Sequence, residues 1–241
     1  NYIGWNWKAG GAAVSNTSGS ITSSVSANTT AGFSVVTWTN TTFTNATVGH
    51  GLGASPSLII TKSRNNTSGW LTWHSSIGST QYLLLQTTGA AVTNASAFNG
   101  VSSTTFTLGD NSAWGVSGYT YVAYCWAEIA GFSKFGSYTG NGSTDGPFVY
   151  LGFRPRYILF KRTDTTGSWV ELDTSRLPAN VANYALYANL SDAETLLSAG
   201  GVDINSNGFK HRGTDSNINA SGGTYIYAAF AENPTKYANA R

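Results

Sequence analysis

Carboxylates are the usual acid–base groups of glycan-cleaving enzymes, and this chain has few of them. Its 241 residues include 11 Asp and Glu, whereas a glycosidase needs two carboxyl groups facing each other across a cleft. Glu171 and Asp173 stand two positions apart, which places both on one face of a predicted strand. A solvent-facing strand explains that spacing better. We therefore expect the protein not to be an enzyme, with glycan degradation as the remote alternative.

Side chains that commonly bind transition metals are also sparse. The single cysteine, Cys125, excludes an internal disulfide and a paired thiolate site, and a buried inert thiol is its simplest interpretation. The histidines lack a metal-binding spacing such as H-E-x-x-H. They are His50, His74 and His211. The sequence accordingly predicts no metal and no cofactor.

One segment is similar to the opening of a calcium-binding loop. In "DINSNG" oxygen-bearing side chains alternate and a glycine follows, as in such loops. The glutamate required at the twelfth loop position is absent, since Thr214 stands there. A hairpin turn is therefore the better interpretation, with calcium as the weaker one. The candidate ligands are Asp203, Asn205 and Asn207.

Two tryptophans offer a stronger indication of binding. Trp70 and Trp169 occupy matching positions in two similar segments, on the strand face opposite the predicted core. That face also carries His74 and Asp173 and changes from Thr and His to Glu and Asp between the segments, which predicts that it faces solvent. One hypothesis is that the two rings stack on a sugar while neighbouring polar groups form hydrogen bonds. The alternative is packing against another sheet or subunit.

The composition limits the classes of partner. Charged residues make up 10% of the chain, against about 25% in an average soluble domain. The formal net charge is only +2, and the basic residues are scattered along the sequence. We therefore expect no nucleic-acid partner. No apolar run reaches the roughly 18 residues of a membrane helix, so we expect no membrane partner. The apolar fraction of 41% suffices for a packed core.

The chain contains an internal duplication. "AGFSVVTWTN" from Ala31 matches "AGFSKFGSYTG" from Ala130, and "SGYTYVAYCWAE" matches "SGGTYIYAAFAE" farther on. Between them, one alignment pairs Pro56 with Pro155, Lys62 with Lys161 and Trp70 with Trp169. The sequence therefore predicts two repeats, 32–130 and 131–234, and a C-terminal tail at 235–241.

The segments before the first repeat extend this pattern. "YIGWNWKAGG" aligns with the closing strand of each repeat, which predicts that residues 1–10 are the closing strand of a preceding unit. We expect this strand to be docked, either on one of this chain's sheets or on a neighbouring copy. Residues 11–31 are rich in Ser and Thr. A flexible linker is the favoured interpretation of this segment, and an extended edge strand is the alternative.

Short apolar or alternating runs separated by turn residues predict an all-β fold. We expect two tandem β-sandwich or jelly-roll-like repeats of about 100 residues. The alternating run 71–74 places Leu71 and Trp73 on one face. Only 183–200, rich in Ala and Leu, has the composition of a helix.

The motifs "FGSYTGNGS" and "SGGTYIYAAFAE" resemble a repeat domain of tailed-phage virion proteins, frequent in marine and cyanobacterial phages and described as tail-fibre-like. The resemblance covers nearly the whole chain and is weakest over 11–31. It implies a structural protein on the particle surface, a tail-fibre or spike segment that contacts a cell-surface glycan. The alternative is a capsid-decoration or appendage subunit without a host ligand. Expected partners are other virion proteins and copies of the chain itself, commonly as homotrimers in such fibres.

Overall fold

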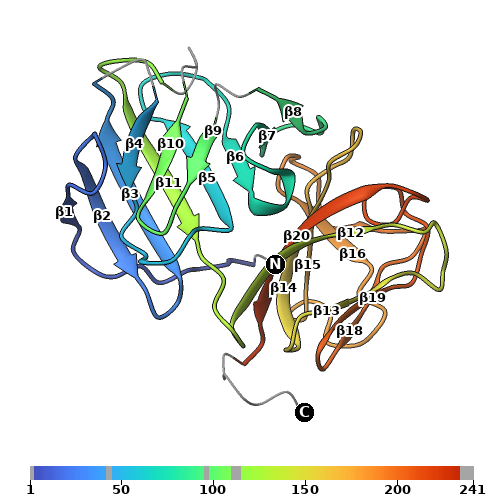
Figure 1. The fold of residues 1–241 in the computed structure, drawn as a ribbon. Helices are drawn as coiled ribbons and strands as arrows, with labels where there is room; N and C mark the ends of the chain where they lie inside the picture. Colours follow the sequence, from blue (N-terminus) through green and yellow to red (C-terminus); the bar gives the residue numbers. More distant parts are fainter. Residues whose placement is uncertain (1–2, 42–44, 95–97, 110–114, 234–241) are drawn as a thin grey trace. The chain divides into compact units, whose positions relative to one another are not determined.

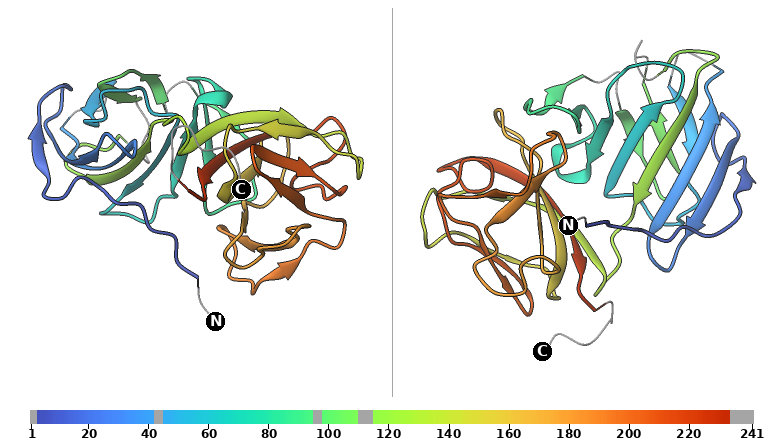
Figure 2. Two further views of the ribbon diagram at one scale, coloured as in Figure 1. Left: turned by 90° about the horizontal axis from the view of Figure 1, so that it is seen from below. Right: turned by 180° about the vertical axis from the view of Figure 1, so that it is seen from behind.

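The computed structural model describes residues 3–41, 45–94, 98–109 and 115–233. Within these ranges the chain forms twenty β-strands, one 3₁₀ turn (η1, Ser75–Ile77) and no α-helix (Figure 1). The fold is therefore all-β, as the turn-separated apolar runs predict. The chain divides into two compact units, each built from a larger and a smaller antiparallel sheet, and Figure 2 shows both from two further sides.

The first unit is an eight-stranded sheet with a three-stranded sheet packed on it. The indole of Trp38 in the large sheet lies 5.6 Å from the ring of Phe106 in the small one, so their side chains form the core between the sheets. The large sheet has the strand order β1 (Val14–Asn16), β2 (Ser23–Asn28), β3 (Phe33–Thr39), β11 (Thr120–Trp126), β5 (Leu58–Ser63), β6 (Leu71–His74), β7 (Gln81–Leu84), β8 (Val92–Thr93). The small sheet has the strand order β4 (Ala46–Gly49), β10 (Thr105–Leu108), β9 (Phe98–Val101).

The second unit repeats this architecture. Its buried cluster joins residues of both sheets, for example Phe160 with Phe209, whose rings lie 5.3 Å apart. The large sheet has the strand order β12 (Ser133–Thr139), β20 (Thr224–Ala231), β14 (Pro155–Arg162), β15 (Val170–Asp173), β16 (Tyr184–Tyr187), β17 (Thr195–Leu196). The small sheet has the strand order β13 (Phe148–Tyr150), β19 (Gly208–His211), β18 (Val202–Asn205).

The two units share one strand order. From β3 to β8 the first large sheet has the same connectivity as the second from β12 to β17. The same aromatic pair also recurs between the first two of these strands. Trp38 stacks on Tyr121 at 5.4 Å in one unit, and Tyr138 stacks on Tyr225 at 5.0 Å in the other. The duplicated sequence therefore folds twice into the same sandwich.

Residues 11–31 are not a flexible linker, so the favoured interpretation of this segment is wrong. They form β1 and β2, which extend the first large sheet beyond β3, at the dark blue edge of Figure 1. Val25 on β2 is only 2% exposed because it packs in the core, and it pairs with Val36 of β3. Ser and Thr alternating with Val suit a strand with one buried face.

The opening segment is docked but is not a strand. Residues 3–10 form no ladder pairing, although every second side chain from Ile3 to Ala9 is half-buried. Trp7 packs edge-to-face on Trp126 at 5.7 Å, and Asn28 donates a hydrogen bond from Nδ2 to the carbonyl of Lys8 at 3.1 Å. The predicted closing strand is thus wrong for 3–10. Residues 1–2, and the tail predicted at 235–241, lie outside the described residues.

The segment 183–200 is not helical. It contributes β16 and β17, with Tyr184 exposed and Ala185 fully buried in the core of the second unit. Ala and Leu favour helices in isolation, but pairing with β15 and burial of one face outweigh that preference here.

Candidate functional site

Each large sheet has an outer face, turned away from its small sheet. In the first unit the register aligns Lys62 with Val122 and Ile60 with Tyr124 on this face. Their neighbours Tyr121 and Ala123 point into the core. The matching residues in the second unit are Lys161 with Ile226 and Leu159 with Ala228. The outer faces carry the tryptophans that the sequence suggests as ligand contacts.

Trp169 is buried in protein and cannot stack on a sugar. Its side chain is 1% exposed, and the indole Nε1–H donates a hydrogen bond to the carbonyl of Leu84 at 3.1 Å. The hypothesis that Trp169 contacts a ligand is therefore wrong, and the packing alternative describes it. The physical reason is that a distant piece of chain covers this part of the face.

That piece is Leu83–Val92, which we call the cover segment. By sequence it lies in the first repeat, but by its contacts it belongs to the second unit. The carbonyl of Thr88 accepts a hydrogen bond from the amide of Gly167 at 2.9 Å, and the amide of Ala91 donates one to the carbonyl of Thr163 at 2.9 Å. The second sandwich thus includes residues that lie at least about 40 positions before its first strand in the sequence.

Lys161 is a buried cation held by the cover segment. Its side chain is 0% exposed, and Nζ donates to the carbonyls of Thr88 at 3.2 Å and Arg162 at 2.8 Å. Burial lowers the pKa of Lys161 to about 8; the nearby Asp164 carboxylate opposes this shift and the Arg162 guanidinium adds to it. Backbone carbonyls of the cover segment thus satisfy donors of both a lysine and a tryptophan on this face.

His74 and Asp173 are also buried, at 1% and 2% exposure. The prediction that they face solvent is wrong, because both faces of their strands are covered. Asp173 accepts hydrogen bonds from the amides of Ser175 and Arg176, each at 2.9 Å, and forms an ion pair with the Arg176 guanidinium. Its carboxylate therefore fixes the turn after β15.

Glu171, the other half of the suggested acid pair, has a different environment from Asp173. Burial raises the pKa of Glu171, and the hydroxyl of Tyr157 donates to its Oε1 at 3.1 Å. Tyr157 itself is only 6% exposed. Glu171 is thus a half-buried carboxyl group hydrogen-bonded within its own sheet.

The calcium-like segment is a tight hairpin. Asn205 pairs with Gly208 across the turn between β18 and β19, and Asp203 forms an ion pair with Arg212 at 2.6 Å. The carbonyl of Asn207 accepts from the amide of Leu151 at 2.9 Å. Among the described residues no three His, Cys, Asp or Glu side chains gather as metal ligands. The turn interpretation therefore accounts for this motif.

The first unit presents the same outer face in a more open state. Trp70 is half-buried and stacks on Tyr124, with ring centroids 6.5 Å apart and an interplanar angle of 24°. Val122 and Lys62 beside them are also half-buried. Lys62 Nζ donates to the carbonyls of Ser63 and Asn66, each at 2.9 Å. Of the four residues predicted to contact a glycan, only Trp70 is partly accessible.

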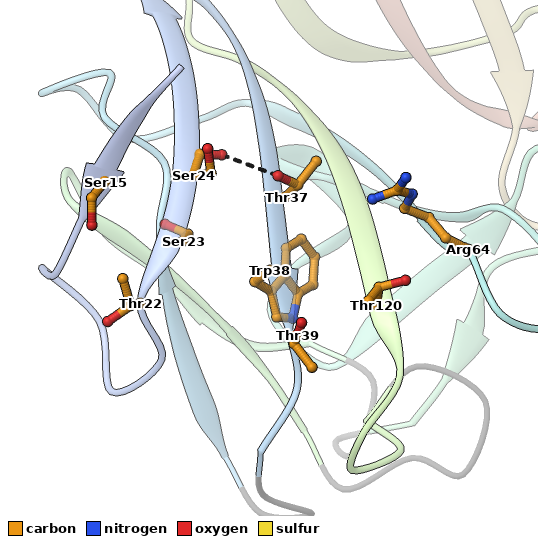
Figure 3. Close-up of a pocket in the computed structure, with 9 residues that line it drawn as sticks. All are labelled: Ser15, Thr22, Ser23, Ser24, Thr37, Trp38, Thr39, Arg64 and Thr120. Carbon is orange, nitrogen blue, oxygen red and sulfur yellow. Dashed lines mark hydrogen bonds between the residues drawn. The ribbon is translucent and has the colours of Figure 1, made fainter.

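An open groove crosses the polar end of this face. It has a volume of about 370 Å³ and is shown in Figure 3. Arg64, directly after β5, points toward β11. The hydroxyl of Thr37 donates to the carbonyl of Ser24 at 3.5 Å. The groove is lined by Ser15, Thr22, Ser23, Ser24, Thr37, Trp38, Thr39, Arg64 and Thr120.

The groove follows from strand register, which sequence reasoning did not use. Thr39, Thr120 and Arg64 align across β3, β11 and the end of β5, so outward side chains form a hydroxyl-rich row. The alternation in "VVTWT" could have indicated the row of hydroxyl groups, because Thr37 and Thr39 must lie on the strand face opposite the buried Trp38. Recognising β2 as a strand would also have been necessary.

A family model described as "Domain of unknown function (DUF7483)" matches residues 1–234. The chain belongs to this family. No curated protein and no solved structure gives a match. The DUF7483 match spans both sandwiches, the opening segment and the cover segment, so the family domain is the pair of units and not a single repeat. Among the described residues of this DUF7483 domain, no helix is long and apolar enough to span a membrane.

Proposed function

We propose that this chain is a structural segment of a tailed-phage particle, a tail fibre or spike built from tandem β-sandwiches and located on the particle surface. The observation that carries the proposal is the cover segment. Leu83–Val92 comes from one repeat by sequence and covers the outer face of the large sheet of the next. Because each repeat can complete a following one in this way, the architecture is suited to an elongated array.

The composition and the sequence resemblance support the same role. A surface of uncharged Ser, Thr, Asn and Gly, with 10% charged residues, suits a part exposed to the medium and held by packing. The motif "SGGTYIYAAFAE" that resembles phage virion repeats contains β20, an interior strand of the second large sheet. The resemblance therefore supports a shared fold of the repeats and does not indicate a ligand site.

Mass spectrometry of purified particles of the encoding phage tests this proposal. We expect peptides of the chain in the particles, and antibodies against it should label the tail or its appendages in electron micrographs. Particles that lack the chain while infected cells contain it would contradict a structural role.

A second candidate function is binding of an acidic glycan, and the groove of the first unit favours it. Ser and Thr hydroxyls can donate to and accept from sugar hydroxyls, and the Arg64 guanidinium matches a sugar carboxylate or sulfate. Arg64 is exposed, and among the described residues its guanidinium has no carboxylate partner. The half-buried Trp70–Tyr124 pair on the same face adds an aromatic surface.

Arg64→Ala tests this second function. On a glycan array we expect the native chain to retain acidic glycans in preference to neutral ones, and the variant to bind them roughly tenfold more weakly, about 1.4 kcal/mol. Arg156→Ala is the control, because Arg156 is a partly exposed arginine of the second unit paired with Glu232 at 3.4 Å. Equal binding by both variants, or no glycan retained at all, would leave the chain as a purely structural subunit.

A further inference from the structure

We propose that the second unit carries a cover segment of its own, residues 184–196, and that it docks on the outer face of the first unit in a second copy of this chain. This inference rests on the proposed role of the repeats as units of an assembly. It assigns that assembly a specific contact: a donor segment on one copy and an acceptor face on the next.

The donor segment matches the cover segment in position. Leu83–Val92 begins in β7 and ends at β8, and residues 184–196 run from β16 to β17, the strands at the same places in the second sheet. In sequence, "QYLLLQT" at the start of one matches "NYALYAN" at the start of the other, which places Leu84 over Leu186 and Thr88 over Leu190. The two segments are therefore equivalent parts of the duplication.

The donor segment exposes large apolar side chains. Tyr184, Leu190 and Leu196 are 40%, 44% and 47% exposed, and Val181 beside them is 40% exposed. They are four of the eight strongly exposed large apolar residues among those the structure describes. Such clustering within sixteen positions marks an interaction surface, because exposed apolar area is unfavourable in water.

The acceptor face differs from its counterpart in burial. In the second unit, Trp169 and Ile226 are 1% and 3% exposed under the cover segment. The matching Trp70 and Val122 of the first unit are half-buried, as is Lys62 at the position of the fully buried Lys161. On this face of the first unit Thr72 and His74 are also buried, and Trp7 packs on Trp126. The open part is therefore confined to the area around Trp70, Val122 and Lys62. A second cover segment of the same kind is the occupant that fits it.

The expected contacts repeat those of the second unit. There, the indole Nε1–H of Trp169 donates to Leu84 and Nζ of Lys161 donates to Thr88. In the intermolecular contact the acceptor for Lys62 is the backbone carbonyl of Leu190, which matches Thr88. Lys62 already donates to Ser63 and Asn66, but an ammonium group has three N–H donors and can add one more.

This contact is heterologous, because donor and acceptor lie on different units of each copy. Heterologous contacts join molecules head to tail and give rings or open filaments. Within the chain the cover segment is tethered, which gives it an effective concentration in the millimolar range, on the order of 1 mM. Between free chains we therefore expect association that increases over the micromolar to millimolar range.

Sedimentation velocity of the full chain tests the donor side. The native chain should shift from monomer to larger species as its concentration rises. Tyr184→Asp should raise the apparent dissociation constant at least about tenfold, because it places a charge in the desolvated contact. Tyr150→Asp is the matched control, since Tyr150 is a 59% exposed strand tyrosine outside the donor segment, and it should associate like the native chain.

Mixing variants tests the direction of the contact. Trp70→Ala and, independently, Val122→Asn remove acceptor contacts, and thermal melting shows whether each remains folded. A donor variant mixed with an acceptor variant should form dimers and nothing larger, because one intact contact remains. A monomeric native chain at every concentration, Tyr184→Asp associating like Tyr150→Asp, or full-length oligomers in the mixture would each overturn the inference. None of these three results would affect the detection of the chain in phage particles. The proposed structural role and the proposed contact between copies can therefore be refuted independently.

Discussion

Trp169→Ala is expected to lower the free energy of unfolding of the second unit by about 3–5 kcal/mol, the range for removing a fully buried large aromatic side chain. Trp169 is 1% exposed, so truncation leaves a cavity against the cover segment. It also removes the donor that the Leu84 carbonyl accepts from at 3.1 Å. The Leu84 carbonyl keeps the hydrogen bond from the amide of Thr87 at 3.2 Å, so the cavity accounts for most of the expected loss.

Trp70→Ala provides the matched comparison at the same position of the other repeat. Trp70 is half-buried, so its removal uncovers less apolar area, and we expect a loss of about 1–2 kcal/mol from the first unit. Urea-induced unfolding followed by circular dichroism measures both variants against the native chain. Equal losses, or a larger loss for Trp70→Ala, would contradict the different coverage of the two outer faces.

A pronounced loss of stability in acid is expected from His211. This side chain is 0% exposed and lies among aromatic rings, 4.7 Å from Tyr138 and 5.5 Å from Phe209 between centroids. Neither ring nitrogen has a hydrogen-bond partner among the described residues. A charged imidazolium there would be unsolvated, and burial lowers the pKa of His211 to about 3.

The direction of the pH effect follows from proton linkage. The folded-state pKa of about 3 lies below the ordinary value of 6.5, so between these limits the unfolded chain binds a proton that the folded chain does not. Above about pH 6.5 both states are neutral and His211 has no effect. Below it, stability should fall by about 1.4 kcal/mol per pH unit until about pH 3, where the folded state also takes up the proton.

His211→Phe should remove this dependence. Phenylalanine fits an aromatic cluster and cannot be protonated, so the difference in unfolding free energy between variant and native chain should grow as the pH falls from 6.5 toward 3. The difference isolates His211, because the carboxylates that also titrate in this range are common to both proteins. A constant difference across that range would show that His211 is not buried as a neutral group.

The sequence predicts much of the architecture because the duplication and the strand pattern are local signals. Matching of Tyr121 with Tyr225 correctly aligns β11 with β20, and the two sheets then show the same strand order. Alternation also correctly assigns Leu71 and Trp73 to the core face. These assignments need only neighbours along the chain or a second copy of the same pattern.

The candidate site could not be predicted in the same way. Alternation places Trp169, Glu171 and Asp173 on one face but does not reveal what covers that face. The covering residues, Leu83–Val92, lie some 80 positions earlier and form their contacts largely through backbone groups. The prediction of a solvent-facing surface failed for that reason.

We infer that the second sandwich requires the cover segment, and a fragment with one tryptophan tests this dependence. Residues 128–233 contain only Trp169, and Leu83–Val92 contains none, so fluorescence of such a fragment reports on this one ring. Two versions are compared, with residues 83–92 or a scrambled copy of them joined to the N-terminus by a flexible linker. We expect blue-shifted emission and cooperative unfolding for the fragment with the native cover segment. The fragment with the scrambled segment should show emission typical of a solvent-exposed tryptophan and should lose cooperativity. Equal emission and equal stability of both fragments would contradict it.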